Sequence, residues 1–408
     1  MSAATAQNLD LTAPPVVSKI AMRSLVVGVV FSVIAIAGIF VSGNGYEEFY
    51  RAYLLSYMDW LGVALGSMAI LMIRHLTGGG WGMVIRRILG AAMRTLPLLA
   101  LLFIPLLFAV KHIYPWAMPL ESIQDAHIRE HLTKNAFITK SYLNFNGFWM
   151  RALFYFAIWN LISYLLTKWS KITDRPGSAD PTERFKVIAG PGLILYGFTI
   201  SFAAIDWVMS LDPSWISTIF GLVILIGEVL SAMAFAVVVE RILYDYKPMS
   251  EMLKPDFVHD HGKWMLAFTM VWAYFNFSQW LIIWAGNLPT EITFYMTRLH
   301  GGWSSVGLFL VVFGFAIPFV MLLSRSFKRN IRKLVWLAVW ILVIRYIDLF
   351  WIIEPNFSKT LHVTWADMVL PFAIGGLWMA FFFRNLGALP LLPAYDPQSV
   401  EVLEPEHG

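Results

Sequence analysis

The stretch LVWLAVWILVIRYIDLFWII, residues 334–353, decides the fold of this chain. It has about the 20 residues that an α-helix needs to cross the hydrocarbon core of a bilayer, and its only charged residues are Arg345 and Asp348. Nine further stretches along the chain are similar in length and composition. In lipid, backbone polar groups must be satisfied within the segment, so such stretches cross as helices. The sequence therefore predicts an all-α integral membrane protein with ten transmembrane helices.

Composition supports this fold class, because 58% of the 408 residues are hydrophobic and only 14% are charged. We expect a cytoplasmic N-terminal segment at residues 1–20, a ten-helix transmembrane domain at 21–383 and a cytoplasmic tail at 384–408. The tail is expected to lie extended on the cytoplasmic surface or on a partner, and a small surface helix is expected around Leu120–Lys134. Pro97 and Pro105 in the third span and Pro318 in the eighth predict kinks. Spans two to five and six to nine are expected to form two four-helix bundles, which the first and last helices flank. The predicted spans are Ala21–Val41, Ala52–Ile73, Ala91–Val110, Phe148–Thr167, Ala189–Ser210, Ile216–Val239, Lys263–Ala285, Trp303–Leu323, Leu334–Ile353 and Trp365–Phe383.

The distribution of basic residues predicts the orientation. Of the 30 Lys and Arg, 21 lie on the side of the predicted termini and 8 on the other side, and the loop at 325–333 alone holds five. Cytoplasmic loops carry an excess of Lys and Arg, so both termini are expected in the cytoplasm. The net charge of +4 therefore reflects the excess of Lys and Arg on the cytoplasmic side of the spans. We expect lipid but no nucleic acid among the partners.

Residue types also limit the cofactors. The chain has no cysteine, which excludes thiolate-held iron–sulfur clusters and covalently attached haem c. Its nine histidines are expected in loops or at span ends, away from the positions that a haem between helices requires. His259 and His261 are interpreted as part of a polar loop. We therefore expect no metal site and no cofactor in this chain.

Ionisable residues inside predicted spans are the candidates for function, because such groups are costly in a membrane. Glu228 is about twelve residues into the sixth span, roughly 18 Å deep, and Arg345 has a similar depth in the ninth. Asp348 lies one turn further outward, Asp206 is in the outer third of the fifth span, and Asp59 is near the outer end of the second. These five residues are the candidates for a proton path.

Arg345 and Asp348 are three residues apart and therefore share a helix face. We expect them to form one interior site together with Asp206 or Glu228. In the simpler interpretation, the charges are ion pairs that lock helices together. In the functional one, Glu228 carries protons as the deepest carboxylate, Asp348 and Asp206 form the outward exit, and Arg345 holds both of them charged.

Four segments resemble one known family. They are SFAAIDWVMSLDPSW at 201–215, NLPTEITFY at 287–295, HGGW at 300–303 and RYIDLFWIIEP at 345–355. Together they resemble the ActF-type membrane subunit of alternative complex III, a bacterial quinol:electron-acceptor oxidoreductase. Such subunits are related to the quinone-binding anchors of the NrfD and polysulfide reductase type.

The resemblance implies a ten-helix subunit of the bacterial inner membrane that holds no redox centre of its own. Haem c and iron–sulfur clusters are expected in partner subunits: a multihaem cytochrome c, an iron–sulfur protein and a quinol-binding membrane subunit. ActF-type subunits are proposed to carry proton half-channels, and the five ionisable residues are the natural candidates. The chain would then anchor an enzyme complex that oxidises quinol and passes the electrons to cytochrome c or another acceptor.

Two other classes of function stay open at this point. The first is a free-standing, proton-coupled secondary transporter, although no pair of helices is broken at matching positions in the two halves, as inverted-repeat transporters often show. The second is a purely structural anchor or quinone-binding subunit, in which the buried charges fix how the helices pack. Co-purification separates the first from a complex subunit, since a transporter would be stable and active alone.

Overall fold

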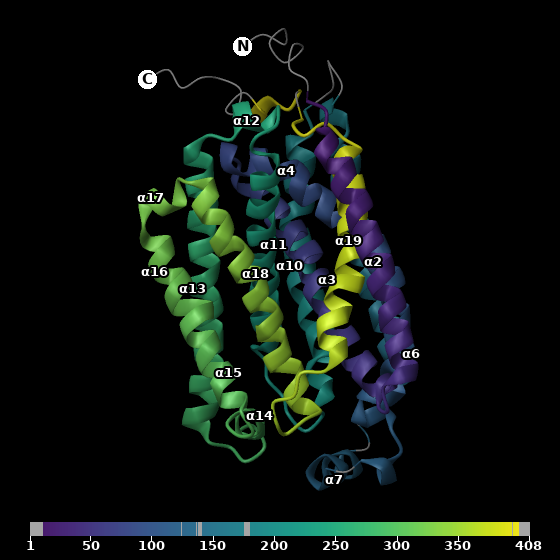
Figure 1. Ribbon diagram of the computed structural model, residues 1–408. Coiled ribbons are helices and arrows are strands. Elements are labelled where there is room, and N and C mark those ends of the chain that lie inside the picture. The colour runs from purple at the N-terminus through teal and green to yellow at the C-terminus, as the bar shows by residue number, and fades with distance from the viewer. Residues whose placement is uncertain are drawn as a thin grey trace.

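The computed structural model describes residues 11–123, 125–135, 137, 141–174, 180–393 and 395–399. These residues form an elongated bundle of helices, drawn in Figure 1, and no β-strand occurs among them. The bundle has two ends. The one where α2 begins and α19 finishes is called the terminal end below, and the other the far end. The predicted all-α fold class is confirmed.

The helices follow the predicted apolar stretches and extend beyond most of them. They are α2 (Pro15–Val41), α3 (Gly45–Thr77), α4 (Gly80–Met93), α5 (Leu96–Leu102), α6 (Ile104–Ile113), α7 (Ala126–Lys134), α9 (Phe145–Ser170), α10 (Thr182–Trp207), α11 (Phe220–Leu243), α12 (Met249–Met252), α13 (Pro255–Gly286), α14 (Thr293–Arg298), α15 (Trp303–Phe309), α16 (Ile317–Leu323), α17 (Arg325–Lys328), α18 (Ile331–Ile353) and α19 (Trp365–Gly387).

Nine continuous helical spans in the described residues are long and apolar enough to cross a membrane, and a bent pair adds a tenth. The bent pair is the predicted third span, in which Gly80–Leu102 and Ile104–Ile113 meet at 53°. Pro97 and Pro105 stand in the first turns of α5 and α6, where a missing N–H costs no helical hydrogen bond. The expected kinks in this span are therefore present, with prolines at the restarts.

The eighth span contains a different irregularity. Between α15 and α16, residues Leu310–Ala316 form a π-helical segment, and Pro318 follows it in the first turn of α16. The indole of Trp340 donates a hydrogen bond of 2.9 Å to the carbonyl of Phe313 inside this segment. A side chain of α18 thus satisfies a carbonyl where the regular α-helical ladder is interrupted.

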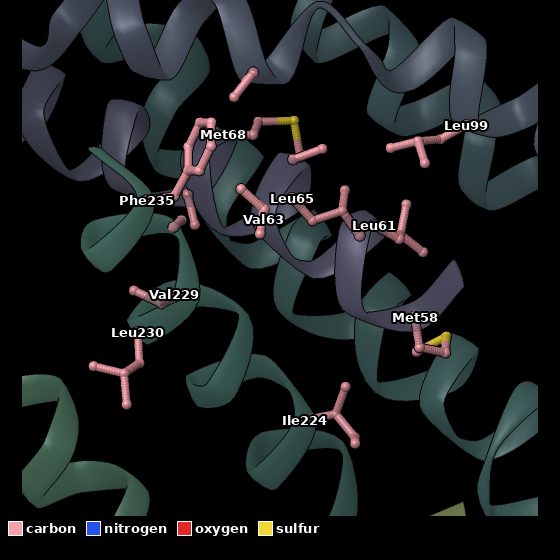
Figure 2. Close-up of a cluster of buried hydrophobic side chains, with 14 of the residues drawn as sticks. Met58, Leu61, Val63, Leu65, Met68, Leu99, Ile224, Val229, Leu230 and Phe235 are labelled. Carbon is pink, nitrogen blue, oxygen red and sulfur yellow. The ribbon is translucent and has the colours of Figure 1, made fainter. Parts of the chain in front are cut away.

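The centre of the bundle is the contact between α3 and α11. Their most apolar windows are 89% and 83% buried, against 11% for α2. Figure 2 shows the apolar cluster there, with Met58, Leu61 and Leu65 of α3 near Ile224 and Val229 of α11. α3 also packs on α4 and α10, while α11 packs on α13 and α18. Residues on the facing sides of these two helices are therefore shielded from lipid.

α2 and α19 form an outer layer against α3. They approach closely at Gly28 and Gly376, where a Cβ on Gly28 would lie 2.8 Å from the carbonyl carbon of Gly376. Small residues at a membrane helix contact allow such backbone approach. In α19, Pro371 cannot donate to the carbonyl of Asp367 four residues earlier. The hydroxyl of Tyr346 donates to that carbonyl instead, at 2.7 Å.

Two peripheral segments differ from the sequence interpretation. The surface helix expected at Leu120–Lys134 begins at Ala126, because the Asp125 side chain caps it by accepting from the backbone N–H of His127. The tail was expected to lie extended on the cytoplasmic surface or on a partner. Its described part folds back onto the chain itself, where Tyr395 donates to the carbonyl of Thr173 at 3.1 Å. Residues 1–10 and 400–408 lie outside the described residues.

Candidate functional site

Glu228 lies in the first half of α11, in the contact with α3. Its carboxylate is buried, and the hydroxyl of Tyr196 on α10 donates to Oε2 at 2.7 Å. The backbone of α3 passes so close that a Cβ on Gly66 would overlap the carbonyl of Glu228. The second oxygen, Oε1, is buried and accepts no hydrogen bond from the described residues. Among the described residues, only one of the two carboxyl oxygens of Glu228 therefore accepts a hydrogen bond.

Arg345 and Asp348 on α18 form the ion pair that their spacing predicts. Both side chains are buried, and the indole of Trp272 on α13 donates to Asp348 Oδ2 at 3.1 Å. The guanidinium reaches α11 because residue 227 is glycine, whose Cβ would otherwise overlap it. Arg345 is thus directed from α18 to the helix position next to Glu228. The Nε of Arg345 is buried and makes no hydrogen bond within the described residues.

A small cavity joins these groups. It is lined by Asp59 and Gly62 of α3, by Glu228 and Ser231 of α11, and by Arg345 of α18. The space open to the centres of water molecules is about 10 Å³, which is roughly what one water needs. Asp59 lies within electrostatic reach of Arg345. The cavity brings together two carboxyl groups and one guanidinium from three helices, with unpartnered atoms on Glu228 and Arg345.

Asp206 is not part of this site. It lies towards the far end, fully buried, where Arg151 of α9 contacts both of its oxygens at 2.8 and 2.9 Å. The hydroxyl of Tyr155 donates to Oδ2 at 2.8 Å, and the ring of Tyr142 stacks 4.0 Å from the Arg151 guanidinium. The expectation that Arg345 holds Asp206 charged is therefore wrong: the neighbouring helix α9 supplies a closer arginine.

His261 is also placed differently from the expectation. His259 and His261 lie in the first turns of α13 rather than in a loop, and His261 is fully buried. Its Nδ1 lies 3.0 Å from Glu240 of α11, and its Nε2 lies 2.8 Å from the carbonyl of Trp81. The helix starts at Pro255, earlier than predicted, because proline at the first position suits a helix start. A buried carboxylate–imidazole pair thus lies near the terminal end.

A second pair of carboxyl groups is found near the far end, where Glu354 and Asp367 are buried and within electrostatic reach of each other. Glu354 Oε1 and Asp367 Oδ1 make no hydrogen bond within the described residues. The other oxygen of Asp367 accepts from the backbone and hydroxyl of Thr364, at 2.8 Å each, as the start of α19. Arg51 lies within electrostatic reach of both carboxyl groups.

Sequence reasoning missed several of the groups that complete these sites. Arg151 is not among the predicted site residues. It lies at the same end of its predicted span as Asp206 does on the next one, and that match is a signal that could have paired them. Tyr196 and Trp272 carry no such signal, because aromatic residues in spans are usually packing. Among the described residues, no group of three or more His, Asp and Glu side chains is arranged to hold a metal ion.

Comparison with known proteins adds no identity. No family model matches the chain, and no curated protein is significantly similar to it.

Proposed function

We propose that this chain is an integral membrane subunit of a bacterial respiratory complex that oxidises quinol, and that it anchors the complex and conducts protons. Two things support the proposal. The four quoted segments resemble the ActF-type subunit of alternative complex III, and the middle of the bundle holds ionisable groups around a cavity. The redox groups, haem c and iron–sulfur clusters, belong to partner subunits in this proposal, and the quinol to the complex.

The observation that supports the proton-conducting role is that Glu228 has one carboxyl oxygen without a hydrogen-bond partner among the described residues. A carboxyl group that only locked helices together would have both oxygens hydrogen-bonded, since buried polar groups in proteins are almost always paired. Glu228 Oε1 instead has no partner among the described residues, and the residue lines a cavity that suits one water molecule. An unpaired oxygen beside such a cavity is an atom that can take up and release a proton.

Each side chain has a separate task in this mechanism. The Tyr196 hydroxyl holds Oε2, so the proton arrives at and leaves from Oε1. A protonated water in the cavity gives its proton to Oε1 and becomes neutral, and the reverse step releases the proton towards Asp59. Arg345 keeps its positive charge, holds Asp348 as its partner and repels a second positive charge. It therefore limits passage to protons that bind to Glu228.

The experiment is a purification from the native bacterium followed by reconstitution into liposomes. We expect the tagged chain to co-purify with proteins that contain haem c and iron–sulfur clusters, and quinol oxidation by the complex to move protons across the membrane. Glu228→Gln keeps the shape and a hydrogen bond from Tyr196 but cannot exchange a proton. It should abolish proton movement while the complex still assembles and oxidises quinol.

The matched control is Glu183→Gln, which changes an exposed carboxylate at the start of α10 and should leave proton movement intact. Proton movement at the wild-type ratio in Glu228→Gln would make Glu228 structural and end the conducting role. A chain that purifies alone and transports a solute would instead favour the proton-coupled transporter. A complex that oxidises quinol without moving protons would leave only the structural anchor.

The proposal includes the orientation inferred from the charge bias, with the terminal end in the cytoplasm. Single cysteines can test this, because the chain has none of its own. Ser326 in α17 and Ser122 at the far end are both exposed. An impermeant thiol reagent added outside intact inner-membrane spheroplasts should label Ser122→Cys and leave Ser326→Cys unlabelled. The reverse pattern would invert the topology.

A further inference from the structure

An apolar groove lies on the outside of the bundle at the terminal end, between α2 and α19, two helices that run side by side in Figure 1. Its lining includes Val17 and Phe383, which are buried, and Met22 and Leu25, which are 64% and 43% exposed. Leu98 of α5 lines it as well. The groove has a volume of about 760 Å³, which is in the range of ligand sites in proteins. It is therefore large enough for an organic ligand.

The lining of this α2–α19 groove contains one charged side chain among the described residues, Arg384. Arg384 stands in the last turn of α19, is exposed, and makes no ion pair or hydrogen bond with any other described residue. The hydroxyl of Ser18, which also lines the groove, donates to the carbonyl of Pro15 at 2.9 Å and is therefore already used. The groove thus combines a long apolar surface with one unpaired positive charge.

Lys19 adds a second positive charge at the edge of the groove. It follows Ser18 directly and lies three residues before Met22, so it is on the same side of α2 as that lining residue. Lys19 is exposed and has no ion pair in the part of the chain that the structure describes. Neither α2 nor the part of α19 after Asp367 contains an acidic residue. The charge complementary to this end of the groove is therefore negative.

The charges and the apolar surface follow one another along the helices. Leu377 lines the groove seven residues before Arg384 on α19, which places it roughly 10 Å further from the terminal end. On α2, Leu25 lies six residues beyond Lys19, roughly 9 Å in the same direction. The hydrocarbon of one leaflet is about 15 Å thick, half of the bilayer core. The groove therefore matches a molecule with an anionic head at Arg384 and an acyl chain that extends into the same leaflet.

We propose that the α2–α19 groove binds one anionic phospholipid from the leaflet at the terminal end. The phosphate accepts hydrogen bonds from the Arg384 guanidinium, Lys19 attracts the negative head, and an acyl chain lies in the groove. A zwitterionic lipid offers the same chains, but its head also carries a positive charge that offsets the attraction. The site depends on the membrane-spanning fold and is independent of the proton conduction proposed at Glu228.

The probes for the experiment are phosphatidylglycerol and phosphatidylcholine with identical acyl chains. The protein, with any subunits that accompany it from its own membrane, is delipidated in mild detergent and titrated with each lipid, and native mass spectrometry counts the bound lipids. One basic residue near a membrane surface contributes about fivefold to the binding of an anionic lipid. We therefore expect the first phosphatidylglycerol to bind roughly twentyfold more tightly than phosphatidylcholine. Arg384→Gln should lower this preference roughly fivefold, whereas Arg384→Lys should keep it.

Two further variants distinguish binding in the groove from general attraction to a basic surface. Ala380→Phe fills part of the groove and leaves both positive charges in place, so it should weaken the binding of the first phosphatidylglycerol. Arg332→Gln removes an exposed basic residue at the start of α18, outside the groove, and it should bind both lipids as the wild type does. Equal affinity for the two lipids would overturn the proposal, and so would wild-type binding of phosphatidylglycerol in Arg384→Gln or in Ala380→Phe.

A photoreactive residue identifies the occupant of the groove in the native membrane. Benzoylphenylalanine in place of the exposed Met22 should cross-link to a phospholipid whose mass identifies an anionic headgroup. A cross-link to a partner subunit or to residues 1–10 of the same chain would show that protein fills the groove and contradict the proposal. Cross-linking to zwitterionic lipid alone would contradict it as well.

Discussion

Asp206 and Glu228 are buried carboxylates on two helices that pack together, α10 and α11, and each accepts a hydrogen bond from a tyrosine hydroxyl. Asp206 has in addition both oxygens held by Arg151. Glu228 keeps one oxygen without a partner, beside a cavity that it shares with Arg345. A carboxylate whose acceptors are all used is fixed in one state. In the proposed function, the carboxyl group with a free oxygen and room for water changes its protonation state, and the two buried residues therefore take different roles.

The surroundings explain the difference. The arginine nearest Asp206 is Arg151 on the adjacent α9, which pairs with no other carboxylate among the described residues. It donates to Asp206 through both Nε and Nη2. The arginine nearest Glu228 is already paired with Asp348 on its own helix. Arg345 therefore reaches the Glu228 site as half of an ion pair. The comparison predicts that disruption of the Asp206 site affects stability, while disruption of the Glu228 site affects function.

The largest expected effect is a loss of stability at the Asp206 site, where both carboxylate oxygens accept hydrogen bonds. Arg151→Met leaves Asp206 buried without its counter-charge, so it should lower the free energy of unfolding by about 3 to 5 kcal/mol. Adding Asp206→Leu to that variant removes the buried carboxylate that has lost its counter-charge. The double variant should therefore regain part of the lost free energy of unfolding. Chemical denaturation in detergent measures both. Arg241→Met, at the exposed pair with Asp245, should cost less than about 1 kcal/mol. If Arg151→Met cost no more than this control, Asp206 would not depend on its arginine.

A smaller effect is expected from filling the space that lets Arg345 approach α11. In Gly227→Ala the new methyl group overlaps the guanidinium, and such overpacking costs about 1 to 3 kcal/mol. Because the guanidinium must move, proton movement in liposomes should fall as well. Gly197→Ala is the matched control, since no atom lies within 4 Å of its new Cβ, and it should be neutral or slightly stabilising. Equal behaviour of the two variants would mean that the Arg345 position is not constrained.

The smallest effects compare the two tyrosines. Tyr155→Phe removes a hydrogen bond to a carboxylate that forms an ion pair with Arg151, so it should cost about 1.5 to 3 kcal/mol, as for a hydrogen bond to a charged group. In the proposed function, Tyr196→Phe removes a hydrogen bond to a carboxyl group that exchanges a proton, and the cost of a hydrogen bond to a neutral group is about 0.5 to 1.5 kcal/mol. Denaturation under identical conditions gives the difference. A larger cost for Tyr196→Phe would indicate that Glu228 is permanently ionised and contradict its role as a carrier.

Local sequence predicted what depends on one helix alone. The ten apolar stretches match nine continuous spans and one bent pair in the described residues, because length and hydrophobicity suffice to define a membrane helix. The Arg345–Asp348 pair followed from a spacing of three residues, which a single helix converts into proximity. The depth of Glu228 in the membrane was predicted from the rise per residue and stays a prediction. The prediction for His261 was wrong because a cluster of polar residues near the end of a span is equally compatible with a loop and with the first turns of a helix.

What the sequence by itself determined is therefore which residues lie in the long apolar helices. Only the tertiary structure decided which of them meet. Arg151 rather than Arg345 reaches Asp206, and Tyr196, Asp59 and Arg345 converge on Glu228 from three different helices. These contacts depend on how the helices rotate about their axes and slide along one another. The rotation and the sliding are fixed by packing between distant segments, such as the close approach of α3 to α11 at Gly66 and of Arg345 to α11 at Gly227. The hydrophobicity of a single helix does not indicate which residues of another helix it will contact.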